Sequence, residues 1–329
     1  MRILFSKIIL RICIMSQSQF QNQSHGYFDN KDKSSFLSPS VTQYGSHMVM
    51  TNVSRETKTK YWNIDTQFCD DYQQHNAHLF TLPQPISNVK SITVSNVEIP
   101  VSFFNISANL GNNSIQITRV STGAISLLVL PDGSYTTDLL QTTMNTSLHA
   151  IDVSLNYTII AGNYSKFTSF SHAYVFEFAV ASNTTTAGFD KYDVKSRLGW
   201  QLGFRDISYR VSSTADLVST SFVDLLKPRY LYLVVDEYSG NTSNTFVSPL
   251  PSSLLNKNIL AKISMDYQVY PVGSVLPANY SNGHLKSDKR TYSGIVNLRK
   301  LQIQLVNEYG VVMDLNGMDF SFCLEIEYE

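Results

Sequence analysis

The sequence predicts an all-β protein. The expected fold is a single jelly-roll β-sandwich of about eight main antiparallel strands, with an inserted helix and an extended N-terminal arm. Three observations predict this class. Many short segments alternate apolar and polar residues, clusters of turn-forming residues separate them, and strands do not alternate with helices as they do in parallel sheets.

The strongest strand signals lie near the C-terminus, between Leu298 and Glu329. Apolar residues alternate with glutamines from Leu301 to Leu305, and again with polar residues from Phe320 to Tyr328. Successive side chains of a strand point to opposite faces, so each run has one apolar face. Both runs are therefore expected to lie inside a sheet whose remaining strands come from upstream.

The remaining strands are predicted from the same alternation, taken in chain order. They cover residues 78–83, 89–99, 103–106, 114–120, 124–130, 151–160, 164–170, 173–180, 217–223, 229–238 and 258–267. Residues 164–170 and 173–180 are expected to pair as a hairpin, and residues 192–204 to form a short helix running into a turn. Two long loops are expected at residues 241–256 and 271–291.

One well-defined helix is predicted at about residues 134–149. Ser134 or Thr136 is suited to the N-cap position, where a hydroxyl accepts a hydrogen bond from a free N–H of the first turn. Leu140, Met144 and Leu148 follow at helical spacing and form one apolar stripe. The helix is expected to pack this stripe against the strands.

The N-terminal part of the chain has a different composition. Residues 1–57 are predicted to form a disordered or extended arm, and Met15 is a second plausible start, so residues 1–14 are not assigned firmly to the mature protein. Residues 58–76 are expected to be a docking segment, and residues 77–329 the jelly-roll domain. The docking segment carries four apolar anchors for an assembly interface: Tyr61, Trp62, Ile64 and Phe68.

Charge and cysteine content exclude some classes of function. The formal net charge is −1 and charged residues make up 16% of the chain, which leaves no basic excess to neutralise nucleic-acid phosphates. The N-terminal apolar run is interrupted by basic residues, so a membrane contact is not expected. The three cysteines are widely spaced and odd in number, so the sequence implies no disulfide framework.

No catalytic, cofactor or metal site is predicted. His75 and His78 lie near Cys69, but their spacing matches no standard zinc pattern. Asp236 and Glu237 end an apolar strand, where a carboxylate pair could transfer protons, although strand ends often carry charge because they meet water.

Three arginines are left as candidates for anion binding or for ordinary ion pairs. They are Arg205, Arg210 and Arg290.

Several long segments resemble virion proteins of the nucleocytoplasmic large DNA viruses. They include KYWNIDTQFCDDY from Lys60, PDGSYTTDLLQTTMN from Pro131, YLYLVVDEYSGN from Tyr230 and the C-terminal run from Val296. The resemblance extends from about Lys58 to the end, and the family is similar to penton-type or minor capsid proteins built on a jelly roll.

This resemblance implies a structural role in an icosahedral capsid, without catalysis or cofactor. The implied partners are further copies of the chain, as a possible homopentamer, a double jelly-roll major capsid protein and other minor capsid proteins. The implied location is the virion, assembled in the host cytoplasm, with no direct nucleic-acid contact. Two alternatives remain: another minor capsid position, and a lectin-like attachment module that uses Tyr280, His284 and Lys286 of the predicted loop.

Overall fold

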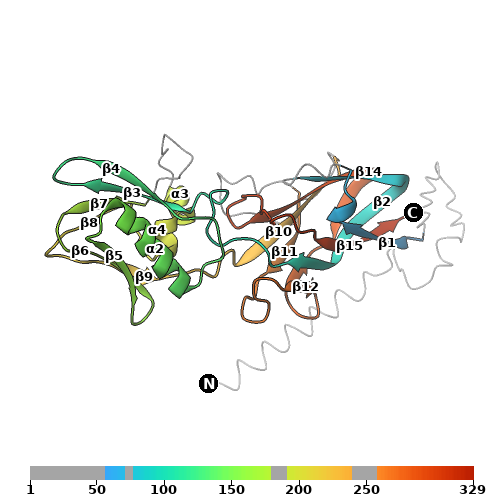
Figure 1. Ribbon diagram of the computed structural model, residues 1–329. Helices are drawn as coiled ribbons and strands as arrows, with labels where there is room; N and C mark the ends of the chain where they lie inside the picture. Colours follow the sequence, from blue (N-terminus) through green and yellow to red (C-terminus); the bar gives the residue numbers. More distant parts are fainter. Residues whose placement is uncertain (1–55, 71–76, 179–190, 239–257) are drawn as a thin grey trace, which may run out of the picture. The chain divides into compact units, whose positions relative to one another are not determined.

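A computed structural model describes residues 56–70, 77–178, 191–238 and 258–329. The chain divides into two units, Met1–Ser54 and Arg55–Glu329, and all described residues belong to the second. The predicted arm therefore lies outside the described residues, except for residues 56 and 57. The described strands fall into two groups, called here the main lobe and the inserted lobe (Figure 1).

The main lobe is one large antiparallel sheet in the order β1-β15-β2-β14-β10-β11-β13, with β12 also paired to β2. Its strands are β1 (Lys58–Asp65), β2 (His78–Pro100), β10 (Tyr230–Asp236), β11 (Ile259–Ser264), β12 (Val275–Asn279), β13 (Leu285–Ser287), β14 (Arg290–Asn307) and β15 (Ser321–Tyr328). The two C-terminal runs are strands, as predicted. They do not pair with each other, because β2 lies between them and hydrogen-bonds to both.

Strand β2 corrects the sequence prediction, which ended one strand at Pro83 and began another at residue 89. The structure has a single strand from His78 to Pro100. Its pairing with β14 shifts register between the Thr81–Lys300 pair and the Ile86–Leu298 pair, and Pro83 falls within this interval. A proline needs no ladder hydrogen bond at a register shift, so the strand continues through it.

The inserted lobe lies between β2 and β10 in the sequence and contains two smaller antiparallel sheets, in the orders β4-β3-β7-β8 and β5-β6-β9. Its strands are β3 (Ser114–Arg119), β4 (Ile125–Val129), β5 (Leu155–Ile160), β6 (Tyr164–Ser169), β7 (Tyr174–Glu177), β8 (Ser208–Val211) and β9 (Leu217–Phe222). Its helices are α2 (Thr137–Ile151), α3 (Lys191–Ser196) and α4 (Leu198–Gln201).

Helix α2 confirms the predicted helix and its buried stripe. The hydroxyl of Thr136 accepts a hydrogen bond from the N–H of Leu139 at 3.3 Å, which caps the N-terminus. Leu140, Met144 and Leu148 are buried. The helix ends at Ile151, slightly later than predicted.

The predicted hairpin of residues 164–170 and 173–180 is wrong. Strand β6 pairs with β5 and β9, whereas β7 pairs with β3 and β8. The rings of Phe167 in β6 and Phe176 in β7 face each other across the core, with centroids 4.7 Å apart. Alternation gives the buried face of each strand but not its hydrogen-bonding partner, so two sheets packed face to face resemble a hairpin in the sequence.

Two further assignments, one loop and one strand, also change. Residues 271–291, predicted as a loop, contain β12, β13 and the first residues of β14. Residues 103–106, predicted as a strand, form only an isolated bridge between Ile106 and Gly133. The second predicted loop, at residues 241–256, lies outside the described residues.

The all-β, jelly-roll-like sandwich architecture is confirmed, with curled antiparallel sheets and a minor helical share. The prediction did not anticipate that the buried side chains form two separate main cores, one in each lobe. The first residues of the predicted docking segment, 58–76, lie within the main sheet. Residues 58–65 form β1, which is part of the main sheet beside β15.

Candidate functional site

Strand β1 presents an open edge of the main sheet. It pairs with β15 on one side and is the last strand in the described sheet order, so its other side has no neighbouring described strand. The four predicted anchors differ in exposure, because three of them alternate along β1 and the fourth lies in the turn that follows it. Ile64 is 1% exposed, Tyr61 is 64% exposed and Phe68 is 72% exposed. Trp62 is half-buried and packs against the core of the main lobe.

Phe68 is held outward by a short, well-anchored turn. It ends η1 (Thr66–Phe68), a 3-10 helix capped by Asp65, whose carboxylate accepts from the N–H of Gln67 at 3.0 Å. The buried Thr66 hydroxyl donates to Asp319 at 2.8 Å and accepts from the N–H of Phe320 at 3.0 Å. The turn is therefore tied to the residues that lead into β15. The sequence analysis did not predict these two hydrogen bonds, called here the Thr66 clamp, because Thr66 and Asp319 are far apart in the chain.

A cavity of about 180 Å³ lies beside this turn and is lined by Cys69, His78 and Phe320, among others. The ring of His78 packs edge-on against that of Phe320, with centroids 5.8 Å apart. Within the described ranges, no group of three or more His, Cys, Asp or Glu side chains could hold a metal ion. His75 lies outside the described residues.

The two carboxylates predicted at a strand end, Asp236 and Glu237, differ in burial and in their partners. Glu237 forms a fully buried ion pair with Arg290, with 2.7 Å between carboxylate and guanidinium. The same guanidinium nitrogen donates to the carbonyl of Val235 at 2.8 Å. Burial raises the pKa of Glu237, and the nearby charge of Arg290 opposes that rise. Asp236 accepts from the N–H of Tyr238 at 2.8 Å and so closes a turn.

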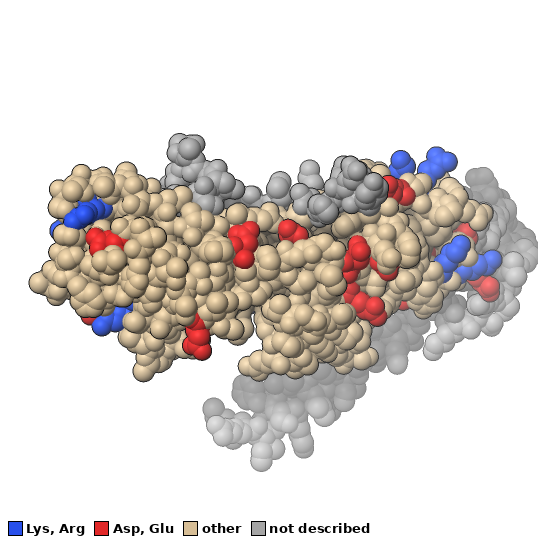
Figure 2. Space-filling model, in the orientation of Figure 1, with Lys and Arg blue, Asp and Glu red and all other residues tan. Residues whose placement is uncertain are grey.

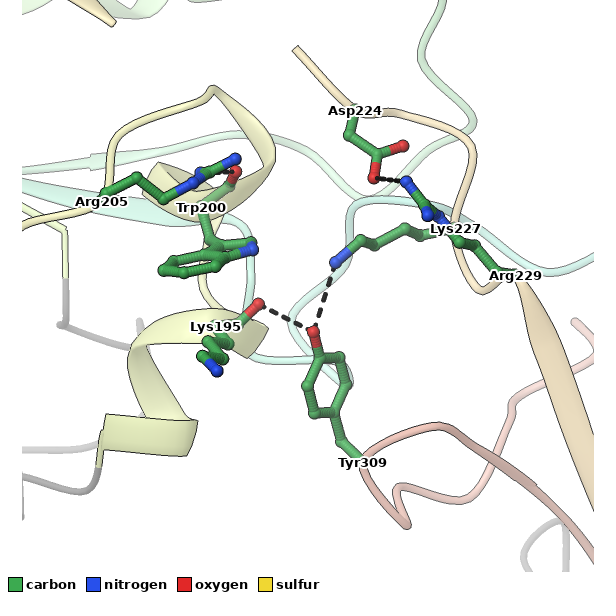
Figure 3. Close-up of polar contacts among 7 residues, drawn as sticks. All are labelled: Lys195, Trp200, Arg205, Asp224, Lys227, Arg229 and Tyr309. Carbon is green, nitrogen blue, oxygen red and sulfur yellow. Dashed lines mark hydrogen bonds and ion pairs between the residues drawn. The ribbon is translucent and has the colours of Figure 1, made fainter. Parts of the chain in front are cut away.

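A polar cluster joins segments from both lobes (Figure 3). The hydroxyl of Tyr309, which follows β14, accepts from the ammonium of Lys227 at 3.2 Å and donates to the carbonyl of Lys195 at 2.9 Å. Burial lowers the pKa of Lys227, and the charge of Glu308 opposes this. The three segments are thus connected through one hydroxyl.

The arginines near this cluster are engaged within the chain. The guanidinium of Arg205 lies over the ring of Trp200, 4.1 Å from its centroid, and donates to the Trp200 carbonyl at 2.8 Å (Figure 3). Arg229 pairs with Asp224 at 2.8 Å. These contacts give Arg205 and Arg229 structural partners, while Arg210 lies on β8 and is exposed.

The three residues considered for glycan contact lie on or near β13. The hydroxyl of Tyr280 donates to the carbonyl of Ser287 at 2.6 Å, and Lys286 pairs with Asp288 at 3.1 Å. The ring of His284 packs edge-on against Tyr270 and contacts the carbonyl of Ser264 at 3.1 Å. All three side chains therefore have partners within the chain.

Charge is sparse on the surface. On the face shown in Figure 2, most of the described surface is neither acidic nor basic, and the charged side chains lie in small separate groups. Among the helices in the described ranges, none is both long enough and apolar enough to cross a membrane.

No protein-family model matches the chain, and no curated protein matches its sequence. Among solved structures, the chain is similar to a crystal structure of the mavirus penton protein, with a TM-score of 0.41 and 9% sequence identity. That alignment covers 84% of this chain and 100% of the mavirus protein.

Proposed function

We propose that this chain is a structural component of the icosahedral capsid of a large DNA virus, penton-type at the five-fold vertex, that acts by assembly without catalysis. The observation that carries the proposal is the edge of β1, which has no neighbouring strand on one side among the described residues and carries the exposed ring of Tyr61, with the exposed ring of Phe68 in the turn that follows it. The sequence resemblance from Lys58 to the C-terminus supports the same role.

The physical features of this edge suit protein–protein assembly. A free strand edge offers backbone donors and acceptors to a strand of another chain, and that partner can gain specificity from the flanking side chains. Aromatic residues are enriched at interface centres because they bury a large area at little conformational cost. The Thr66 clamp keeps Phe68 in place before binding, which reduces the entropy lost on association.

The proposed partners follow from the resemblance. They are further copies of this chain, a double jelly-roll major capsid protein and other minor capsid proteins. The proposed location is the virion, with assembly in the host cytoplasm. The low surface charge visible in Figure 2 favours contacts with proteins rather than with phosphate groups.

Co-assembly with the major capsid protein tests the proposal. The full chain and a Tyr61→Ser/Phe68→Ser variant are each co-expressed with a double jelly-roll major capsid protein, and the copies retained in purified shells are counted. The variant is expected to be retained at least about tenfold less, because two interface anchors are removed. A Val153→Ser/Phe170→Ser variant is the control, since these residues are also highly exposed, at 79% and 73%, but lie in the inserted lobe.

Equal retention of the two variants would contradict the assigned edge, and no retention of the full chain would contradict the capsid role. Imaging the shells gives the position of the protein. Density at the vertices supports the penton-type assignment, whereas density beneath the facets would replace it with another minor capsid position.

A further inference from the structure

Strand β4 carries an exposed apolar row at the edge of its sheet. Ile125, Leu127 and Val129 point outward and are 66%, 44% and 43% exposed. Leu128 points the opposite way into the core of the inserted lobe and is 1% exposed. Strand β4 pairs only with β3 among the described strands. A row of this kind on an edge strand promotes association with another strand.

The exposed residues of β4 also carry its unpaired backbone groups. At the two ends of the ladder, the N–H of Leu130 donates to Asn113 at 2.7 Å and the N–H of Arg119 donates to Ala124 at 2.9 Å. Hydrogen-bonded pairs alternate along an antiparallel ladder, so Leu128 and Ser126 also bond to β3. The N–H and C=O groups of the alternate residues, Ile125, Leu127 and Val129, therefore point away from β3.

Strand β5, an uncharged edge in the other sheet, shows how such an edge can be covered. The side-chain amide of Asn145 in α2 accepts from the N–H of Tyr157 at 2.7 Å and donates to its carbonyl at 2.9 Å. Gln141, one turn earlier in α2, accepts from the N–H of Ile159 at 2.8 Å. The helix thus occupies the edge of β5. Strand β9, at the other edge of this sheet, also has a backbone partner outside the sheet, since the N–H of Ser221 donates to the carbonyl of Gly203 at 3.1 Å.

Apart from β1, whose edge is the proposed capsid interface, the remaining edge strands in the described ranges carry residues that discourage pairing. They contain arginine, lysine or proline: Arg210 in β8, Lys286 in β13 and Pro277 in β12. Charged residues and proline on edges are a common protection against unwanted association. Strand β4 has neither. No charged residue lies between Arg119 and Asp132, and the strand itself, ISLLV, contains no proline.

We infer that β4 is the docking site of a second copy of this chain, joined edge to edge around a two-fold axis. In an antiparallel pair centred on Leu127, each Leu127 faces its counterpart, and Ile125 of each copy faces Val129 of the other. The two apolar rows then merge, and the outward backbone groups of both strands become paired. A contact between identical edges is tolerated because it brings no like charges together. This inference does not depend on the capsid role.

A charge-exchange experiment tests the two-fold contact directly. The solution mass of the full chain is measured by light scattering over a dilution series, alone and as the variants Leu127→Lys and Leu127→Glu. Each variant places like charges opposite each other at the axis, so each is expected to have half the mass of the wild type. A mixture of the two variants is expected to recover the wild-type mass, because lysine then faces glutamate.

Val218→Lys is the matched control, since Val218 is 43% exposed on β9 and its replacement is expected to leave the mass unchanged. Near-UV circular dichroism verifies that each variant is folded, as expected for changes at exposed positions. The inference is overturned if the wild type is monomeric at every concentration, or if the two Leu127 variants keep its mass. It is also overturned if both variants lose mass but their mixture does not recover it, or if deleting residues 1–54 alone halves the mass.

Discussion

The two lobes are built from the same kind of strand but stabilised by different cores. The main lobe has long strands centred on β2, and its core consists mainly of isoleucine, valine and leucine, with the Glu237–Arg290 pair buried beside it. The inserted lobe has short strands from two sheets, and its core is built around stacked rings, including Phe178 and Phe204 with centroids 4.7 Å apart.

This difference shows how strand length relates to core chemistry. Long paired strands bring many medium-sized side chains into one layer, because the ladder itself sets their positions. Short strands from two sheets supply fewer inward positions, so each must contribute more buried area, and aromatic rings do so. The same division leaves more strand edges in the inserted lobe, and helix α2 covers only one of them.

The largest expected effect concerns the buried ion pair of the main lobe. Arg290→Met leaves the Glu237 carboxylate buried without its partner, which should lower the free energy of unfolding by about 4 to 5 kcal/mol. Urea denaturation measures this change. The double variant Glu237→Leu/Arg290→Met is the control and should recover most of the loss. If the single and double variants were equally destabilised, the loss would come from packing and not from an uncompensated charge.

The aromatic core of the inserted lobe should respond next. Phe178 is 1% exposed and stacks on Phe204, so Phe178→Ala should lower the free energy of unfolding by about 3 to 4 kcal/mol. Phe178→Leu, which keeps most of the volume, should cost less than half as much. Hydrogen exchange should show the loss of protection in β7 and β8 first. A loss centred on β2 and β15 would mean that the two cores act as one.

The clamp beneath the proposed β1 interface should give a smaller effect. Thr66→Val removes a hydroxyl that donates to Asp319 and accepts from Phe320, which should cost about 1 to 2 kcal/mol in urea denaturation. Thr66→Ser retains the hydroxyl and should remain close to the wild type. A valine variant as stable as the serine variant would show that these hydrogen bonds do not hold the turn.

The smallest effect is expected from the hydrogen bond between Tyr174 and Asp152 in the inserted lobe. The Tyr174 hydroxyl and the Ser154 N–H lower the pKa of the Asp152 carboxyl from 3.8 to about 2. A depressed carboxyl pKa adds stability above the unfolded pKa, and this stability is lost as the pH falls through about 2.

Tyr174→Phe should therefore destabilise the protein by about 1 kcal/mol at pH 7, since solvent screening weakens this partly exposed bond. The difference from the wild type should shrink as the pH falls and vanish only below about pH 2. Tyr280→Phe is the control, because its hydroxyl bonds to a carbonyl that does not titrate. A difference between wild type and Tyr174→Phe that stays constant with pH would exclude the ionised Asp152 as its source.

Local features of the fold were predictable from the sequence, and pairing partners were not. Alternation located β15 and helical spacing located α2, because both signals depend on near neighbours in the chain. Alternation could not distinguish the β6–β7 packing from a hairpin, and Pro83 was interpreted as a strand end although it lies at a register shift.

The candidate surfaces were predictable only in part. Tyr61 is exposed on the edge strand β1 and Phe68 is exposed in the turn that follows it, whereas Ile64 is buried in the main core and Trp62 packs against it. Composition alone could not separate these roles, since the side that faces the core depends on pairing with β15. The row on β4 has a weak sequence signal, an apolar run on both faces between two turns, but its open edge becomes evident only from the sheet order.

The solution mass of the intact chain, compared with a chain that begins at Arg55, tests the central claim of assembly through strand edges most directly. The account predicts an oligomer for the intact protein, with five chains for the penton-type assignment once Leu127→Lys has removed the two-fold contact of β4. It also predicts that Tyr61→Ser/Phe68→Ser reduces this mass, while Val153→Ser/Phe170→Ser does not. A monomer for the intact chain, the shortened chain and every variant, over the whole concentration range, would contradict the account.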